Sequence, residues 1–150
     1  MNQEGRILLV EDDLNDVELM LSALEKFNLR NEVVVVNDGE EALEYLNRSG
    51  KFRLRPAGHP VAVFLDLKMP KVNGLEVLRQ MKTDGELKMI PVIVITSSRE
   101  EPDIKKAYEL GVNAYVVKPV DFQQFMDAIS QVGLFWAVVN EPPPGSVPKR

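Results

Sequence analysis

The stretch Val61-Ala62-Val63-Phe64-Leu65-Asp66-Leu67-Lys68-Met69-Pro70 decides the fold, because an apolar run stops at an acid. Five consecutive apolar residues rich in Val and Phe are typical of a strand buried on both faces of a sheet. Pro70 and the Asn73-Gly74 pair then force the chain to turn. In open α/β sheets, ligands bind at the carboxyl ends of central strands. Alone, however, Asp66 is equally well explained as a solvated acid that ends a strand.

Composition limits the class of protein. The 150 residues suffice for one domain with a full core. A net charge of -5 argues against direct nucleic-acid binding, which needs a basic surface. The absence of Cys excludes disulfides and thiolate chemistry. Without a 20-residue apolar run or a signal-peptide pattern, we expect no membrane segment and a cytoplasmic location.

Short apolar runs alternate with segments of helical periodicity along the chain. Strands are predicted at 7–10, 33–36, 61–65, 92–95 and 114–117, and helices at about 14–28, after Asp38, after Asn73-Gly74, from Glu101-Pro102 to Gly111, and after Asp121. Five strands that alternate with five helices predict a parallel sheet covered on both faces. We therefore expect an α/β, doubly wound, flavodoxin-like fold with strand order 2-1-3-4-5. One domain would span 5–140 and include an extended C-terminal helix, and 141–150 would be a disordered Pro-rich tail.

Four of the five predicted strands end in a functional group. Glu11 and Asp12 follow the first strand, Asp66 the third, Thr96 the fourth and Lys118 the fifth. Parallel strands have their carboxyl ends at one edge, and neighbouring strands lie about 4.8 Å apart. These side chains should therefore converge on one crevice, where the winding of the sheet reverses.

Clustered carboxylates repel one another, by roughly 1 kcal/mol per pair at about 4 Å in water and about 4 kcal/mol at an effective dielectric near 20. Such a cluster either takes up protons or binds a cation. Oxygen ligands alone favour a hard cation such as Mg²⁺, which phosphate oxygens commonly complete. Asp66 is then a plausible nucleophile for aspartyl-phosphate chemistry, assisted by Lys118 and Thr96.

Four motifs in this order resemble the receiver domain of two-component response regulators over about residues 5–132. They are Ile7-Leu8-Leu9-Val10-Glu11-Asp12-Asp13, Leu65-Asp66-Leu67-Lys68-Met69-Pro70 with Gly74, Val92-Ile93-Val94-Ile95-Thr96-Ser97-Ser98, and Tyr115-Val116-Val117-Lys118-Pro119. The resemblance implies a phosphoacceptor with self-catalysed phosphorylation and dephosphorylation, not an enzyme that turns over a separate substrate. Its phosphoryl group would come from a histidine kinase. Because no second domain is expected after the receiver, the output would be a contact with another protein.

The resemblance also implies roles for single residues. Asp66 would accept the phosphoryl group, and Mg²⁺ would be bound by Asp66, by Asp12, by Glu11 mainly through water, and by the backbone carbonyl of Lys68. Thr96 and Lys118 would contact the phosphoryl oxygens. Lys118-Pro119 would be a cis peptide bond. Tyr115 would be an aromatic switch that turns inward when Thr96 moves.

The chain resembles more closely the small response regulators paired with bacterial phytochrome kinases. Tyr108-Glu109-Leu110-Gly111, the long loop before the third strand and Phe135-Trp136 carry this likeness. The helix end around Phe135, Trp136, Val138 and Val139 is apolar on nearly every side, which is typical of an interface. We expect a homodimer contact there, against the alternative of a helix that folds back onto its own domain.

Several alternatives compete with these interpretations. The four strand-end charges could be a structural ion network, and Asp13 is better explained as a helix cap than as a metal ligand. An Mg-dependent aspartyl-phosphate phosphatase of similar fold would need a second carboxylate where Lys68 stands. A flavin or nucleotide site would need a Gly- or Ser/Thr-rich loop after the first strand, which is acidic instead. His59 lies in a Pro/Gly loop, which argues against a phosphorelay role.

Overall fold

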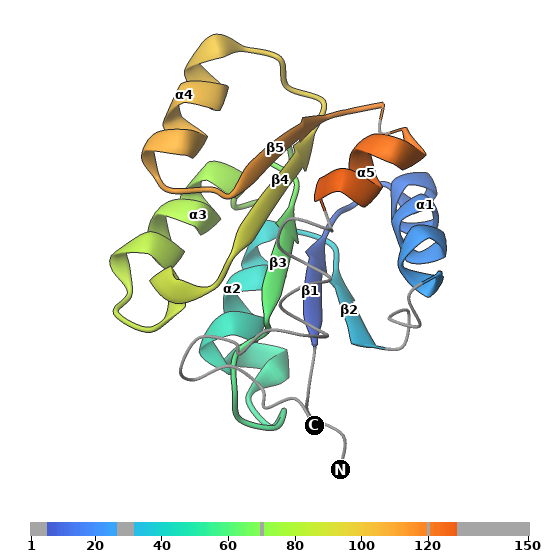
Figure 1. Ribbon diagram of the computed structural model, residues 1–150. Helices are drawn as coiled ribbons and strands as arrows, with labels where there is room; N and C mark the ends of the chain where they lie inside the picture. Colours follow the sequence, from blue (N-terminus) through green and yellow to red (C-terminus); the bar gives the residue numbers. More distant parts are fainter. Residues whose placement is uncertain (1–5, 27–31, 70, 120, 129–150) are drawn as a thin grey trace.

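The computed structural model describes residues 6–26, 32–69, 71–119 and 121–128. Five parallel strands form one sheet in the order β2-β1-β3-β4-β5, which confirms the predicted topology (Figure 1). The strands are β1 (Ile7–Val10), β2 (Val33–Val36), β3 (Ala62–Leu65), β4 (Val92–Thr96) and β5 (Ala114–Val117). All side chains of β1, β3 and β4 are buried, as expected for strands with helices on both faces.

The helices cover the two faces of the sheet (Figure 1). They are α1 (Leu14–Glu25), α2 (Gly39–Asn47), α3 (Gly74–Thr83), α4 (Glu101–Glu109) and α5 (Phe122–Ala128), with short 3-10 turns η2 (Gly50–Phe52) and η3 (Leu87–Met89). One core cluster joins α1 and α5 to the sheet, and another joins α2, α3 and α4 to the opposite face. None of the described helices is both long enough and apolar enough to cross a membrane.

Polar side chains cap the N-termini of helices at the positions that the sequence predicts. Asp13 accepts hydrogen bonds from the Asn15 and Asp16 amides, which confirms its role as the cap of α1. Asp38 caps α2, and Asp121 accepts from the Gln124 amide in the first turn of α5. These caps hold the strand-to-helix turns in place at the edge of the sheet where the functional groups stand.

The loop after β3 is held by a close backbone approach at Gly74, the first residue of α3. The Gly74 amide donates to the Leu67 carbonyl oxygen at 3.0 Å. A Cβ atom at Gly74 would lie 2.3 Å from the Asp66 carbonyl oxygen and 2.6 Å from the Leu67 Cα atom. Both are backbone atoms, so no side-chain rotation relieves the overlap. A glycine is therefore required beneath Asp66.

Gly74→Ala should destabilise the protein by about 2 kcal/mol, because the added methyl group overpacks a backbone contact. Urea unfolding followed by circular dichroism measures this loss. Gly85→Ala is the matched control, because a Cβ atom there meets no atom within 4 Å, and its midpoint should stay close to wild type. Equal midpoints for the two variants would contradict the close approach.

Candidate functional site at the carboxyl edge of the sheet

The strand register places the acidic residues side by side. Val10 pairs with Leu65, so the residues that follow them, Glu11 and Asp66, leave neighbouring strands at the same level. Carboxylate oxygens of Glu11, Asp12 and Asp66 lie within 4.8 Å of one another. Glu11 and Asp66 are buried, whereas Asp12 is exposed. Two of the three charges are thus withdrawn from water, which increases their mutual repulsion.

The ammonium of Lys118 enters this cluster from the end of β5. Its Nζ atom lies 2.9 Å from Glu11, 3.1 Å from Asp66 Oδ2 and 2.8 Å from Asp16 Oδ2. The lysine side chain is only 13% exposed, so solvent screens these ion pairs weakly. A single cation therefore faces the charge of three carboxylates.

Asp16 is the contact that sequence reasoning missed. It lies in the first turn of α1, where an acid is usually explained by the helix dipole or by solvation. Its side chain instead makes the shortest of the three contacts of Lys118. Its spacing of four residues from Asp12 was the available signal, because that spacing keeps an acid of the first turn near the strand end.

Burial and like charge shift the ionisation of the cluster. Burial, with a smaller contribution from the charge of Asp66, raises the pKa of Glu11 to about 7, although Lys118 and the Asp13 amide oppose this shift. Burial alone would lower the pKa of Lys118. Hydrogen bonds to Asp16 and Glu11, with the charge of Asp66, outweigh burial and raise the pKa of Lys118 above its ordinary value. Lys118 is therefore a permanent cation at neutral pH, while Glu11 exchanges a proton near that pH.

Both oxygens of Asp66 have donors. Oδ1 accepts from the Lys68 amide at 3.0 Å, and Oδ2 accepts from Lys118 at 3.1 Å. The peptide bond between Lys118 and Pro119 is cis, as the family resemblance implied. Asp66 is thus a buried, oriented carboxylate, with its amide bonded to the Val10 carbonyl at 3.1 Å.

The hydroxyl groups lie on the β4 side of the cluster. Thr96 is fully buried at the end of β4, and its Oγ1 accepts a 3.4 Å hydrogen bond from the Ser98 amide. Tyr115 on β5 donates its hydroxyl proton to the Ser98 carbonyl oxygen at 3.1 Å. Burial is the main cause that raises the pKa of Tyr115. Ser98 therefore connects Thr96 to Tyr115.

The donor set fits a hard divalent cation. Every candidate ligand is an oxygen atom, and the carboxylates of Glu11, Asp12 and Asp66 stand close enough to share one ion. Lys118 and Thr96 stand at the same edge of the sheet, at the ends of β5 and β4. The predicted interface residues Phe135, Trp136, Val138 and Val139, and the predicted tail 141–150, lie outside the described residues.

Comparison with known proteins shows likeness along most of the chain. The sequence profile of the response regulator receiver domain matches residues 7–130. Response regulator Rcp1 of Synechocystis sp. is 35% identical over 130 residues, which cover 87% of each protein. The solved structure of the bacteriophytochrome response regulator RtBRR is 62% identical with a TM-score of 0.80, over 95% of this chain and 86% of that one. The structure of the Mn²⁺-bound form of Rcp1 is 34% identical with a TM-score of 0.79, over 93% and 99%.

Lys118→Met should destabilise the metal-free protein by about 3 kcal/mol at pH 8, because it leaves buried carboxylates without their cation. The loss should be smaller at pH 6. The raised pKa of Glu11 means that, between about pH 4.5 and pH 7, the folded state holds a proton that the unfolded chain has lost, so the contribution of Glu11 to stability falls over that range and is fully lost above pH 7. Lys118 lowers the pKa of Glu11, so its removal raises that pKa further. Folded Lys118→Met therefore keeps the Glu11 proton to a higher pH, and ionising Glu11 at pH 8 costs the variant more stability than it costs wild type.

Urea unfolding in EDTA at both pH values measures the difference. Lys71→Met is the matched control, because Lys71 pairs with Asp38 and Glu40 but its side chain is 61% exposed, so its removal should leave the midpoint unchanged. A Lys118→Met loss that is the same at pH 6 and pH 8 would contradict the coupling of Lys118 to Glu11.

Proposed function

This chain belongs to the response regulator receiver domain family, and we propose that it is a phosphorylation-dependent switch with Asp66 as its phosphoacceptor. The observation that carries the proposal is the position of Asp66. It is buried at the end of a central strand, between the acidic pair Glu11 and Asp12 and the ammonium of Lys118. A carboxylate held in this way can act as a nucleophile toward a phosphoryl group.

Magnesium is the cofactor that the donor set suits. Asp12 and Asp66 would bind it directly, Glu11 mainly through water, and the Lys68 backbone carbonyl would complete the protein ligands. When bound, the ion supplies positive charge that neutralises developing charge on phosphoryl oxygens. The existence of a Mn²⁺-bound form of the relative Rcp1 supports a divalent cation here. The positions of the carboxylates and of Lys118 determine where the positive charge of the ion would act.

The chain's own residues carry the rest of the reaction. Asp66 attacks the phosphorus atom and keeps the phosphoryl group as an acyl phosphate, while the histidine of the donor kinase leaves. Lys118 turns part of its hydrogen bonding from the carboxylates to a phosphoryl oxygen, and the Thr96 hydroxyl donates to another. Because Ser98 joins Thr96 to Tyr115, a shift of Thr96 reaches the half-buried Tyr115 on β5. Tyr115 is the proposed switch residue.

The partners follow from the relatives. RtBRR is a bacteriophytochrome response regulator, which supports a cytoplasmic histidine kinase, and specifically a bacteriophytochrome, as the phosphoryl donor of this chain. We further propose that residues 5–140 form the receiver with a long last helix. Phe135, Trp136, Val138 and Val139 would form a homodimer contact, and 141–150 would be the disordered tail.

The second candidate is an Mg-dependent phosphatase that forms an aspartyl phosphate. Such an enzyme needs a second carboxylate two residues after its nucleophile, to act as acid and base on an outside substrate. Lys68 holds that position here, and its side chain pairs with Asp103 at 3.2 Å. We therefore prefer a phosphoacceptor that catalyses its own phosphorylation and hydrolysis over an enzyme with an external substrate.

Acetyl phosphate or a labelled histidine kinase, with Mg²⁺, should label the wild-type protein but not Asp66→Asn. EDTA should abolish the label, because it removes the Mg²⁺ that neutralises the negative charge on the phosphoryl oxygens. Labelled protein is quantified on a phosphate-affinity gel. Asp13→Asn is the control, because asparagine also caps helices and the cap lies outside the proposed phosphoacceptor group. Equal label on Asp66→Asn and wild type would remove Asp66 from its role.

Truncation after Ser130 should convert a homodimer into a monomer, because it removes the apolar residues Phe135, Trp136, Val138 and Val139. Sedimentation velocity measures the change. Truncation after Asn140 removes only the Pro-rich tail and should leave the dimer intact. An unchanged species after the longer truncation would rule out this interface.

A further inference from the structure

A continuous path of polar contacts leads from Asp66 to Thr96 by way of α4. The Lys68 amide donates to Asp66, and the Lys68 ammonium pairs with Asp103 Oδ2 at 3.2 Å. The same Asp103 oxygen accepts the Ser98 hydroxyl proton at 2.6 Å, and the Ser98 amide donates to Thr96. The path therefore touches the phosphoacceptor at one end and the proposed phosphoryl-binding hydroxyl at the other.

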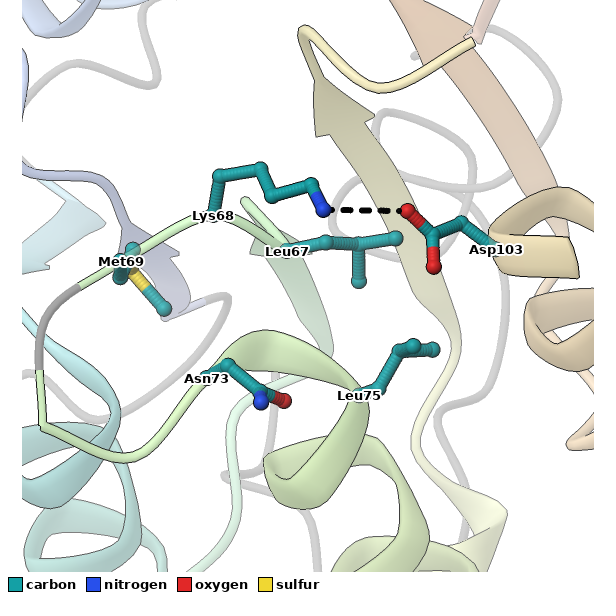
Figure 2. A pocket seen from close by; sticks show the side chains of 6 residues that line it. All are labelled: Leu67, Lys68, Met69, Asn73, Leu75 and Asp103. Atoms are coloured by element: carbon teal, nitrogen blue, oxygen red, sulfur yellow. Dashed lines mark ion pairs between the residues drawn. The ribbon is translucent and has the colours of Figure 1, made fainter. Parts of the chain in front are cut away.

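Asp103 is the one helical residue in this path, in the first turn of α4. Figure 2 shows the Lys68 side chain extending past Leu67 toward Asp103, above a cavity of about 480 Å³ that Asn73 and Leu75 also line. The ion pair thus bridges this opening and joins the loop after β3 to α4.

We propose that Asp103 is a positioning residue that holds the Lys68 ammonium away from Asp66, and that a phosphoryl group on Asp66 competes for this ammonium and releases the start of α4. The inference rests on the proposed function of Asp66. Among the described residues, the Lys68 ammonium forms an ion pair with Asp103 alone. The other nearby lysine, Lys118, already faces three carboxylates.

The balance of charge makes the competition effective. Phosphorylation gives Asp66 about one additional negative charge and three strong acceptor oxygens. Lys68 lies two residues after Asp66, and its amide is hydrogen-bonded to the Asp66 carboxylate. The lysine side chain itself is flexible. Its side chain is 56% exposed, so its pair with Asp103 is screened and weak. The competition requires a weak Lys68–Asp103 ion pair, because the phosphoryl group could not displace Asp103 from a strong one.

Linkage fixes the sign of the test. If Asp103 and a phosphoryl group compete for Lys68, removal of the Asp103 charge must tighten binding of a phosphoryl mimic. Asp103→Asn keeps an oxygen that accepts from Ser98 and removes only the charge. We expect it to bind beryllofluoride, with Mg²⁺ present, about two- to fivefold more tightly than wild type, a range set by the modest strength of exposed ion pairs. In Lys68→Met, the Asp103→Asn substitution should have no effect.

The experiment measures beryllofluoride affinity by calorimetry and amide hydrogen exchange of the α4 first turn. Exchange there should be faster in unliganded Asp103→Asn than in wild type, and should approach that of the liganded wild type. Glu109→Gln removes one charge from the same helix without touching Lys68 and should match wild type in both readouts.

Each outcome decides between the two proposals. If wild type binds beryllofluoride and Asp103→Asn binds it with the same affinity, the competition is overturned and Asp66 remains the proposed phosphoacceptor. The same conclusion follows if Asp103→Asn tightens binding as much in the Lys68→Met background as in wild type. Unchanged exchange at α4 would overturn the release of that helix. If wild type fails to bind beryllofluoride, or if Asp66→Asn binds it as tightly as wild type, the function proposed for Asp66 falls, and the competition falls with it.

Discussion

The ammonium of Lys118 lies within hydrogen-bonding distance of Glu11, Asp16 and Asp66, and this contact makes the acidic strand ends compatible with a folded sheet. Two of these carboxylates are almost fully buried, where unpaired charge is costly. The sequence left open whether the cluster takes up protons or binds a cation. The structure contains elements of both, because a lysine supplies an internal cation and burial raises the pKa of Glu11.

The same arrangement explains how a local chemical change can reach the surface. Asp66 directly follows the buried central strand β3, and Gly74 packs directly against its backbone. Thr96, Ser98 and Tyr115 instead lie along neighbouring segments joined by single hydrogen bonds. A fixed Asp66 beside weakly tied hydroxyl groups is an arrangement suited to the proposed switch, in which charge added to Asp66 would move the weaker partners and leave the scaffold in place.

The fold was largely predictable because its signals are local. Five apolar runs predicted the five strands, alternation with helices predicted parallel pairing, and the winding rules gave the confirmed strand order. The same rules predicted that Glu11, Asp66 and Lys118 meet at one edge. The boundaries were less predictable: the strand predicted at 61–65 begins at Ala62, and the turn η3 carried no recognised signal.

Contacts that depend on helix orientation could not be predicted from sequence. Asp16 and Asp103 look like ordinary acids of first helical turns, and only the packing of α1 and α4 decides that they face Lys118 and Lys68. The exposure of Asp12 beside a buried Glu11 likewise depends on how the chain leaves β1. The proposed roles of the site residues in phosphoryl transfer rest on chemistry and on the family, and they remain predictions.

The most direct test of the crowded strand ends is a carbon-13 NMR titration of the side-chain carboxyl groups in the metal-free protein. We expect Glu11 to titrate near pH 7, because burial and Asp66 disfavour its charged form, and we expect Mg²⁺ to lower that midpoint by displacing the proton. A midpoint close to the ordinary value of 4.5 that does not respond to Mg²⁺ would contradict the arrangement of carboxylates around Lys118.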